Sequence, residues 1–165
     1  MSTFTVRTMT AHDGEALLTF ETYNHLWFES HIDARPQSFY SIPGVTDHIE
    51  GYLSAFANGA WHPFVIEHSN AAIVGRANLK NINAPKGSAQ VGYRIDQRYC
   101  GQGLATLALQ RLIHEAKARW GLTQLCAHVY TTNIGSRKVL ERCGFRADTA
   151  AMDLSTNERR LLLSI

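Results

Sequence analysis

The sequence contains few cysteines, almost no net charge and no long apolar run. Its three cysteines, Cys100, Cys126 and Cys143, are an odd number without Cys-x-x-Cys spacing, which predicts neither a disulfide framework nor a metal site. Sixteen basic and 14 acidic side chains leave a net charge of +2, so nucleic-acid and membrane partners are not expected. No segment is apolar for long enough to span a membrane, and residues 1–4 lack the layout of a signal peptide. We therefore expect a cytoplasmic protein.

The most informative stretch is a glycine-rich loop between a predicted strand and a predicted helix. Apolar and polar residues alternate through Val91, Tyr93 and Ile95, as in a strand. After Gly101 and Gly103, apolar residues recur at helical spacing, at positions 104, 107, 108, 112, 113 and 116. The first N–H groups of a helix have no partner within the helix and lie at the positive end of its dipole. The loop therefore predicts a phosphate site.

Two common nucleotide-binding motifs do not fit this loop. The dinucleotide pattern Gly-x-Gly-x-x-Gly needs a third glycine, and Thr106 stands at its position. The P-loop needs Lys and then Ser or Thr after its last glycine, but Leu104 and Ala105 stand there. What remains is the pattern Arg-x-x-Gly-x-Gly over residues 98–103.

A second motif follows about 30 residues after the loop. Residues 133–145 read Asn-Ile-Gly-Ser-Arg-Lys-Val-Leu-Glu-Arg-Cys-Gly-Phe. They resemble the motif N-x-x-S-x-x-x-(L/Y)-E-(K/R)-x-G-F of the GNAT superfamily of acyl-CoA-dependent N-acyltransferases, and residues 98–103 resemble the pyrophosphate-binding motif of the same family. The local sequence looks most like the branch that acetylates the N-terminal amines of ribosomal proteins.

The resemblance implies a single GNAT domain over residues 1–165 with an α/β (α+β) fold. Its mixed, mostly antiparallel sheet should have about six to seven strands and be splayed at the cofactor site, with about four helices on both faces. Residues 1–59 would form acceptor-site helices and residues 60–165 the acetyl-CoA-binding core. The residue patterns predict strands at 4–9, 61–67, 72–79, 90–95, 122–129, 145–153 and 159–164, helices at 16–27, 46–58, 104–116 and 133–143, a loop at 29–43, and turns at 69–70 and 81–87.

By resemblance, the cofactor is acetyl-CoA, bound as a co-substrate and without a metal. Its pyrophosphate would meet the N–H groups of the loop and of the first helical turn, with a basic side chain nearby. The residues assigned to it are Arg98, Gly101, Gln102, Gly103, Leu104 and Ala105.

The pantetheine arm would lie in the splay, next to the backbone of Ile95 and Asp96. The alternative for Asp96 is a helix-capping or solvated carboxylate. Asn133 is expected to cap the second helix, and in the family the matching residue also binds the cofactor arm. Arg137 and Lys138 could reach the adenosine phosphates or lie on a solvated helix face.

The resemblance places Ser136 near the thioester sulfur, where its hydroxyl would give a proton to the departing thiolate. Serine in a first helical turn is also common for local hydrogen bonding alone. The general base is open, because many relatives have Glu where this sequence has Gln90, and an amide cannot take a proton. His128 is one alternative, since histidine accepts a proton near neutral pH; Glu21, Glu29 and Glu67 are others. Cys100 could be a nucleophile, but a small filler beside the cofactor is the simpler interpretation.

The first functional hypothesis is acetyl transfer from acetyl-CoA to a primary amine, with the N-terminal α-amine of a peptide or protein as the preferred acceptor. A small-molecule amine such as a polyamine, an amino acid or an antibiotic is the alternative, and a deep acidic pocket would favour it. A non-catalytic acyl-CoA-binding sensor on the same fold is a third hypothesis, supported by the missing Glu at position 90. The protein could be a monomer or a homodimer.

Overall fold

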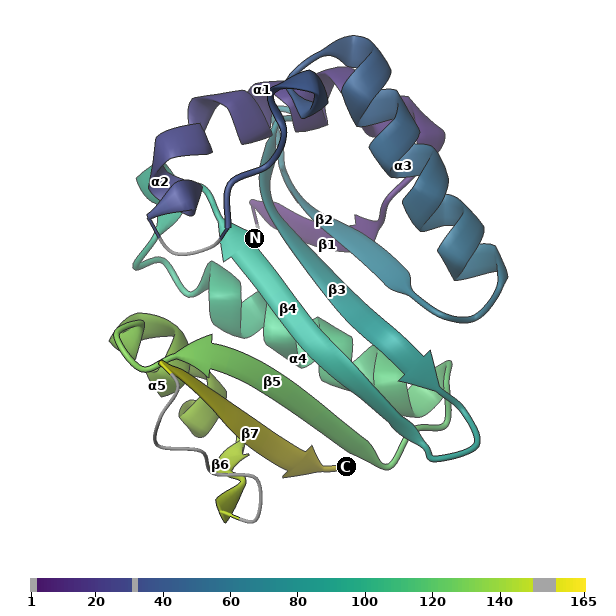
Figure 1. Cartoon of the computed structure of the whole chain (residues 1–165), viewed down its shortest axis with the longest axis vertical. Coiled ribbons are helices and arrows are strands. Elements are labelled where there is room, and N and C mark those ends of the chain that lie inside the picture. The colour runs from purple at the N-terminus through teal and green to yellow at the C-terminus, as the bar shows by residue number, and fades with distance from the viewer. Residues whose placement is uncertain (1–2, 31–32, 150–156) are drawn as a thin grey trace.

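The chain forms a seven-stranded mixed sheet with helices on both faces (Figure 1). The computed structural model describes residues 3–30, 33–149 and 157–165. The strand order is β1-β2-β3-β4-β5-β7-β6, and neighbours are antiparallel except β4 and β5, which are parallel. The strands are β1 Phe4–Thr8, β2 His62–His68, β3 Ile73–Asn83, β4 Ser88–Ile95, β5 Gln124–Tyr130, β6 Arg146–Ala147 and β7 Glu158–Ser164. The expected α/β fold with a mostly antiparallel sheet is confirmed.

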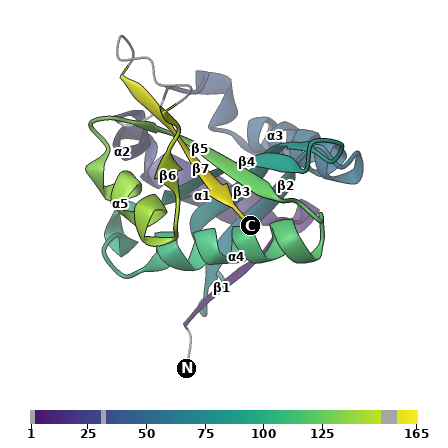
Figure 2. The ribbon, with the colours of Figure 1, turned by 90° about the horizontal axis from the view of Figure 1, so that it is seen from below.

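Helices cover both faces of this sheet, and each face has its own apolar core. The α-helices are α1 Gly14–Tyr23, α2 His25–Glu29, α3 Ile42–Ala57, α4 Leu104–Ala118 and α5 Ile134–Arg142, and the 3₁₀ helices are η1 Ala11–Asp13, η2 Gln37–Phe39 and η3 Gln97–Tyr99. The core under α4 and α5 contains Leu109, Leu112 and Phe145. The core under α1–α3 contains Phe20 and Ile49. Figure 2 shows the sheet between α4 and α3. Within the described residues, no helix is both long and apolar enough to cross a membrane.

Strands β4 and β5 separate partway along their length. Residues 88–90 of β4 pair with residues 124–126 of β5, and no pairing joins the two strands beyond this point. β4 nevertheless continues to Ile95 and β5 to Tyr130, so the two strands diverge toward their carboxyl ends (Figure 1). The splay implied by the family resemblance is therefore present.

The first predicted helix is divided into α1 and α2, which raises the number of α-helices from about four to five. Asn24 stands at the break and is 1% exposed. Its Nδ2 donates to the carbonyl of Phe20, and its Oδ1 accepts from the backbone N–H of Gln97. A side chain that bonds a distant loop competes with helix continuation. The hydrogen bond between Gln97 and Asn24 thus joins the break between α1 and α2 to the start of η3.

The third helix begins earlier than the sequence predicted. The loop expected at 29–43 contains η2, and α3 starts at Ile42 rather than near residue 46. Ser41 is its N-cap and accepts from the N–H of Gly44. The loop expected at 29–43 includes Pro43, but proline is tolerated in a first helical turn because the N–H there has no helical partner anyway.

The remaining strand predictions differ mainly at their ends. The hairpin through residues 69–70 is confirmed, but β3 continues to Asn83, so the turn expected at 81–87 is confined to 84–87. Of the strand expected at 145–153, Arg146 and Ala147 form β6 and pair with Leu162 and Leu161 of β7. Residues 150–153 lie outside the described residues.

Candidate active site

The glycine loop presents a free helix N-terminus at the open end of the splay. Gly101 and Gly103 both have φ of +80°, and a Cβ added at either position would meet nothing within 4 Å. Glycine is favoured at both positions by the backbone conformation and not by lack of space, because L side chains rarely adopt this backbone geometry. Gly103 is the N-cap of α4, and no side chain caps the helix. The N–H groups of the first turn are therefore open to a ligand such as the predicted phosphate.

Asp96 and Arg98 are engaged with each other beside this loop. The Asp96 carboxylate is buried, caps η3 at the N–H of Arg98, and accepts from Nη2 of the same arginine at 2.8 Å. The Arg98 guanidinium also lies 3.7 Å from the ring centroid of Tyr23. Burial would raise the pKa of Asp96, but the hydrogen bonds from Arg98 lower it. This ion pair holds the loop in place and leaves the Arg98 side chain half exposed.

The backbone of Ile95 and Asp96 was expected to face the splay, but the backbone groups of Asp96 are bonded elsewhere. The N–H of Asp96 donates to Val74 of β3, and its carbonyl accepts from Tyr99, so both backbone groups of Asp96 have partners. Asp96 therefore takes the capping role that was its alternative. Because successive residues of a strand direct their backbone groups to opposite edges, Ile95 and Tyr93 face the β5 side. They lie beyond the last β4–β5 pair, where an amide-bearing arm could bind them.

Ser136 and Tyr93 meet across the splay. The hydroxyls are 2.8 Å apart, and the Tyr93 hydroxyl also reaches the Ser136 carbonyl at 3.3 Å. Burial raises the pKa of the Tyr93 phenol, and the bond to Ser136 offsets part of this. The phenol therefore keeps its proton at neutral pH and is able to donate it. Tyr93 was not among the predicted site residues, although the Val91–Tyr93–Ile95 alternation places it on the face that packs against α4.

The other predicted residues of the second motif lie at the start of α5. Asn133 caps the helix, as predicted, and its Oδ1 accepts from the N–H of Ser136 at 3.2 Å. Arg137 pairs with Glu141 one turn later at 3.2 Å on an exposed face. This is the solvated arrangement that was one of its two interpretations, and among the described residues Arg137 forms no ion pair with the loop.

All four candidate bases have a charged or ionisable partner. Glu67 bonds Arg7 at 2.7 Å, and Glu29 bonds His25 at 2.7 Å. Burial would raise the pKa of Glu21, but the charges of Arg76, Arg94 and Arg35 lower it, so its carboxylate is held ionised as their counter-ion. The fourth candidate, His128 on β5, contacts Glu158.

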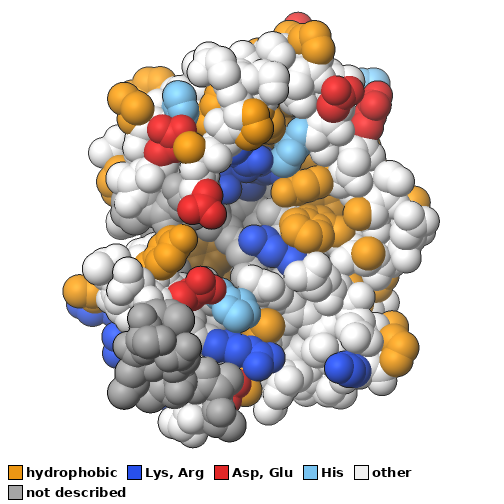
Figure 3. Space-filling view, viewed as in Figure 1, with side chains coloured by type: hydrophobic (Ala, Val, Ile, Leu, Met, Phe, Trp, Pro, Cys, Tyr) orange, Lys and Arg blue, Asp and Glu red, His pale blue; other side chains and the backbone are white. Residues whose placement is uncertain are grey.

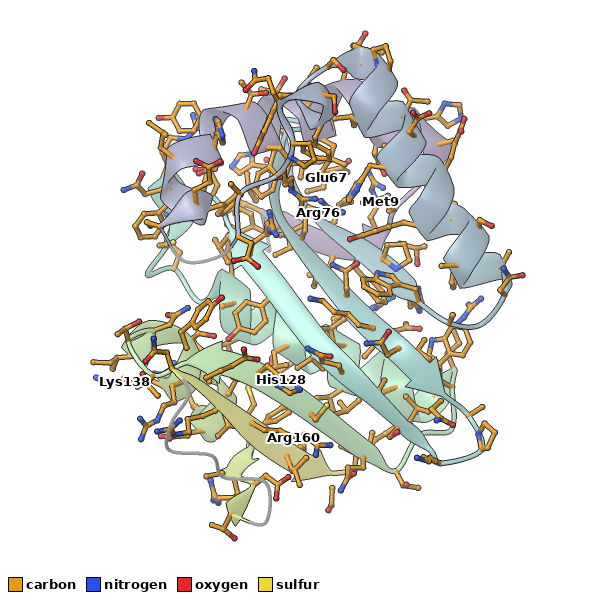
Figure 4. The ribbon with its side chains drawn as sticks, viewed as in Figure 1. Met9, Glu67, Arg76, His128, Lys138 and Arg160 are labelled. Atoms are coloured by element: carbon orange, nitrogen blue, oxygen red, sulfur yellow. The ribbon has the colours of Figure 1, made fainter. Side chains whose placement is uncertain are left out.

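His128 lies on the sheet face that carries α1–α3, because Ala127 and Val129 on either side of it belong to the opposite core. Its Nδ1 is 3.0 Å from Glu158, and the side chain is 38% exposed. Figure 4 shows it over β5, beside the splay. Gln90 lies on the same face of β4, opposite Lys80.

Cys100 does not have the features of an activated nucleophile. Burial and the nearby Asp96 raise the pKa of its thiol, so little thiolate forms at neutral pH. Among the described residues, no group of three His, Cys, Asp or Glu side chains is placed to hold a metal ion.

Comparison with protein-family models matches residues 3–146 to the acetyltransferase (GNAT) domain. The chain belongs to the GNAT acetyltransferases. It is thus an acetyl-CoA-dependent N-acetyltransferase, and the non-catalytic sensor hypothesis is set aside. A probable N-acetyltransferase of Bacillus subtilis (strain 168), YjcK, is 26% identical over 151 residues, which cover 90% of this chain and 83% of that protein.

Solved GNAT structures share the whole fold. The ribosomal-protein-S5-alanine acetyltransferase from Vibrio fischeri has a TM-score of 0.88 at 21% identity, over 100% of this chain and 93% of that one. RimL, a ribosomal L7/L12 α-N-protein acetyltransferase solved with coenzyme A, has a TM-score of 0.87 at 21% identity, over 100% and 96%. At this identity the likeness shows the GNAT fold and leaves the acceptor open.

Proposed function

We propose that this GNAT enzyme transfers the acetyl group of acetyl-CoA to the N-terminal α-amine of a peptide or protein, by direct attack within a ternary complex. The observation that carries the proposal is the 2.8 Å contact between the hydroxyls of Ser136 and Tyr93, at the point where β4 and β5 have separated. A proton donor there would stand beside a thioester threaded through the splay.

In this proposal the cofactor lies along the open edge of β4. Its pyrophosphate binds the first N–H groups of α4, from Gln102 to Ala105, because these groups have no helical partner and the dipole favours an anion. The pantetheine amides pair with the backbone of Ile95, and Asn133 contributes its amide from the start of α5. Arg98 contributes indirectly, by holding the loop through Asp96.

The chemical step needs an oxyanion donor and an acid. The amine attacks the thioester carbonyl, and the tetrahedral oxyanion accepts a hydrogen bond from a β4 N–H that faces the splay. Collapse of the intermediate breaks the carbon–sulfur bond, and the thiolate takes a proton from the Ser136 hydroxyl. Tyr93 then reprotonates Ser136 through the hydrogen bond between them and recovers its own proton from solvent.

The amine must be neutral when it attacks. An α-amino group has a pKa of ~8, so a useful fraction is neutral near pH 7.5 without a strong base. His128 is the proposed proton acceptor, directly or through water, because it lies on β5 beside the splay, on the sheet face that carries α1–α3. The amino-terminal layer of α1–α3 would form the wall that receives the acceptor chain.

Turnover of acetyl-CoA with peptides tests the proposal. Thiol release is measured with Ala- and Ser-initiated peptides, with the same peptides blocked at the N-terminus, and with spermidine. We expect turnover with the free peptides only. Ser136→Ala should lower kcat much more than it weakens acetyl-CoA binding, whereas Ser54→Ala, at an exposed serine of α3, should change neither. Turnover of spermidine alone would contradict the proposed acceptor.

A further inference from the structure

Three arginines surround one buried carboxylate on the sheet face under α1–α3. Arg76 of β3, Arg94 of β4 and Arg35, which precedes η2, surround Glu21 of α1. The distances from their nitrogens to the carboxylate are 2.8, 3.3 and 3.6 Å for Arg76, Arg94 and Arg35. Glu21 is 1% exposed and Arg76 is 2% exposed. Three guanidinium groups around one carboxylate leave an excess of two positive charges.

The helices that pack on this cluster supply aromatic rings, and among the described residues no second carboxylate lies within ion-pair distance of the three arginines. Phe28 of α2 lies against Arg94, and Tyr52 of α3 lies against Arg76. His48 of α3 accepts a hydrogen bond from Nη2 of Arg76 at 2.8 Å, which requires an unprotonated Nε2. Burial and the charge of Arg76 hold the pKa of His48 at about 3, so this side chain is neutral.

A fourth cation extends the cluster along β3. Lys80 lies directly over Gly92 of β4, where an added Cβ would fall 2.7 Å from Nζ. The described residues form no ion pair with Lys80, and burial together with Arg94 and Arg76 lowers its pKa. Lysine and arginine side chains are visible in the hollow between the α1–α3 layer and the sheet (Figure 3), and Arg76 points into the same region (Figure 4).

The cluster adjoins the proposed reaction centre. Arg94 directly follows Tyr93 on β4, and their side chains project from opposite faces of the strand. Arg94 and Arg35 remain partly exposed, at 24% and 20%, and can therefore meet a ligand. An extended peptide advances about 3.3–3.6 Å per residue. An acceptor whose amine reaches the splay would thus bring the side chains of its next two or three residues over these cations.

We propose that the acceptor is a peptide or protein N-terminus with acidic side chains at its second and third positions. This inference rests on the proposed function and specifies its substrate class. The carboxylates of the acceptor would complete the charge balance that Glu21 begins, through charge-assisted hydrogen bonds to the exposed parts of Arg94 and Arg35. A polyamine would bring further positive charge into the same hollow and is disfavoured for that reason.

Matched peptides test the proposal. Three Ala-initiated peptides of equal length, with Asp-Asp, Ser-Ser or Lys-Lys at positions two and three, are compared with free aspartate and spermidine at low salt. We expect kcat/KM to be at least about tenfold higher for the Asp-Asp peptide than for the Ser-Ser peptide and lowest for the Lys-Lys peptide. The preference should shrink as ionic strength rises.

Charge-neutralising variants test which cations produce the preference for the Asp-Asp peptide. Arg94→Gln should reduce the ratio of kcat/KM between the Asp-Asp and Ser-Ser peptides to about threefold or less. Lys80→Gln should lower it as well and provides the test if the first variant does not fold. Lys117→Gln removes the same charge from an exposed site on α4, on the opposite face of the sheet, and should keep the full ratio.

The outcomes separate the two proposals. Equal kcat/KM for all three peptides would overturn the acidic preference while the N-terminal acetyltransferase assignment stood. A higher kcat/KM for free aspartate than for any peptide would overturn the peptide as the occupant. Turnover of spermidine without any peptide would overturn both proposals.

Discussion

Removing the hydroxyl of Tyr93 tests the proposed proton pathway most directly. Tyr93→Phe deletes the group 2.8 Å from the Ser136 hydroxyl and keeps the ring that packs against the α4 core. A hydrogen bond that supports a developing charge contributes about 1.5–3 kcal/mol. This free energy corresponds to about a 10- to 150-fold change in rate. We therefore expect kcat with an Ala-initiated peptide to fall by that factor, with the Kd of acetyl-CoA within about threefold of its original value.

The assay combines steady-state thiol release with calorimetric binding and thermal unfolding. Loss of one neutral hydrogen bond costs about 1 kcal/mol, so Tm should fall by only about 2–4 °C for a chain of this length. Thr123→Val is the matched control, because its hydroxyl donates to Gly87 at the other end of β4 and β5. It should show a stability loss of the same order and an unchanged kcat.

The double variant distinguishes a shared pathway from two separate contributions. If Ser136 and Tyr93 act in series, Tyr93→Phe combined with Ser136→Ala should be no slower than the worse single variant. A kcat within about twofold of the original for Tyr93→Phe, or fully additive losses in the double variant, would refute the relay.

Three further predictions concern the loop, the buried cluster and pH. Gly103→Val should weaken CoA binding by at least tenfold in calorimetry while the protein stays folded by circular dichroism, because φ of +80° is strained for valine; unchanged affinity would contradict the pyrophosphate assignment. Glu21→Gln should destabilise the protein by about 3–5 kcal/mol in urea unfolding, since it leaves three arginines without their shared carboxylate; a loss below about 1 kcal/mol would contradict this. Burial lowers the pKa of His48 to about 3 and that of His62 to about 4. The unfolded chain therefore binds more protons at these sites below about pH 6.5, and stability should fall by about 1 kcal/mol per pH unit for each histidine as pH drops from 6.5 toward 4. His62→Gln should make this slope shallower in thermal unfolding, and an unchanged slope would exclude His62 as a contributor.

Local features of the chain were predictable because their causes lie within a few residues. Gly101 and Gly103 adopt positive φ, and Asn133 caps α5 through a residue three positions away. The strands that alternate apolar and polar residues were found for the same reason. The prediction was wrong where a local signal has two meanings. Proline, as at Pro43, can stand at the start of a helix as well as break one.

The sequence by itself determined the family, the loop that suits a pyrophosphate, the cap of the second motif and the general layout of the sheet. Only the tertiary structure decided which side chains meet: Tyr93 with Ser136, 43 positions apart, and Glu21 with Arg76, 55 positions apart. Such pairs depend on strand register and helix docking, which burial of apolar area across the whole chain selects. The positive charge around Glu21 follows from these pairings, because one carboxylate neutralises only one of the three arginines that surround it.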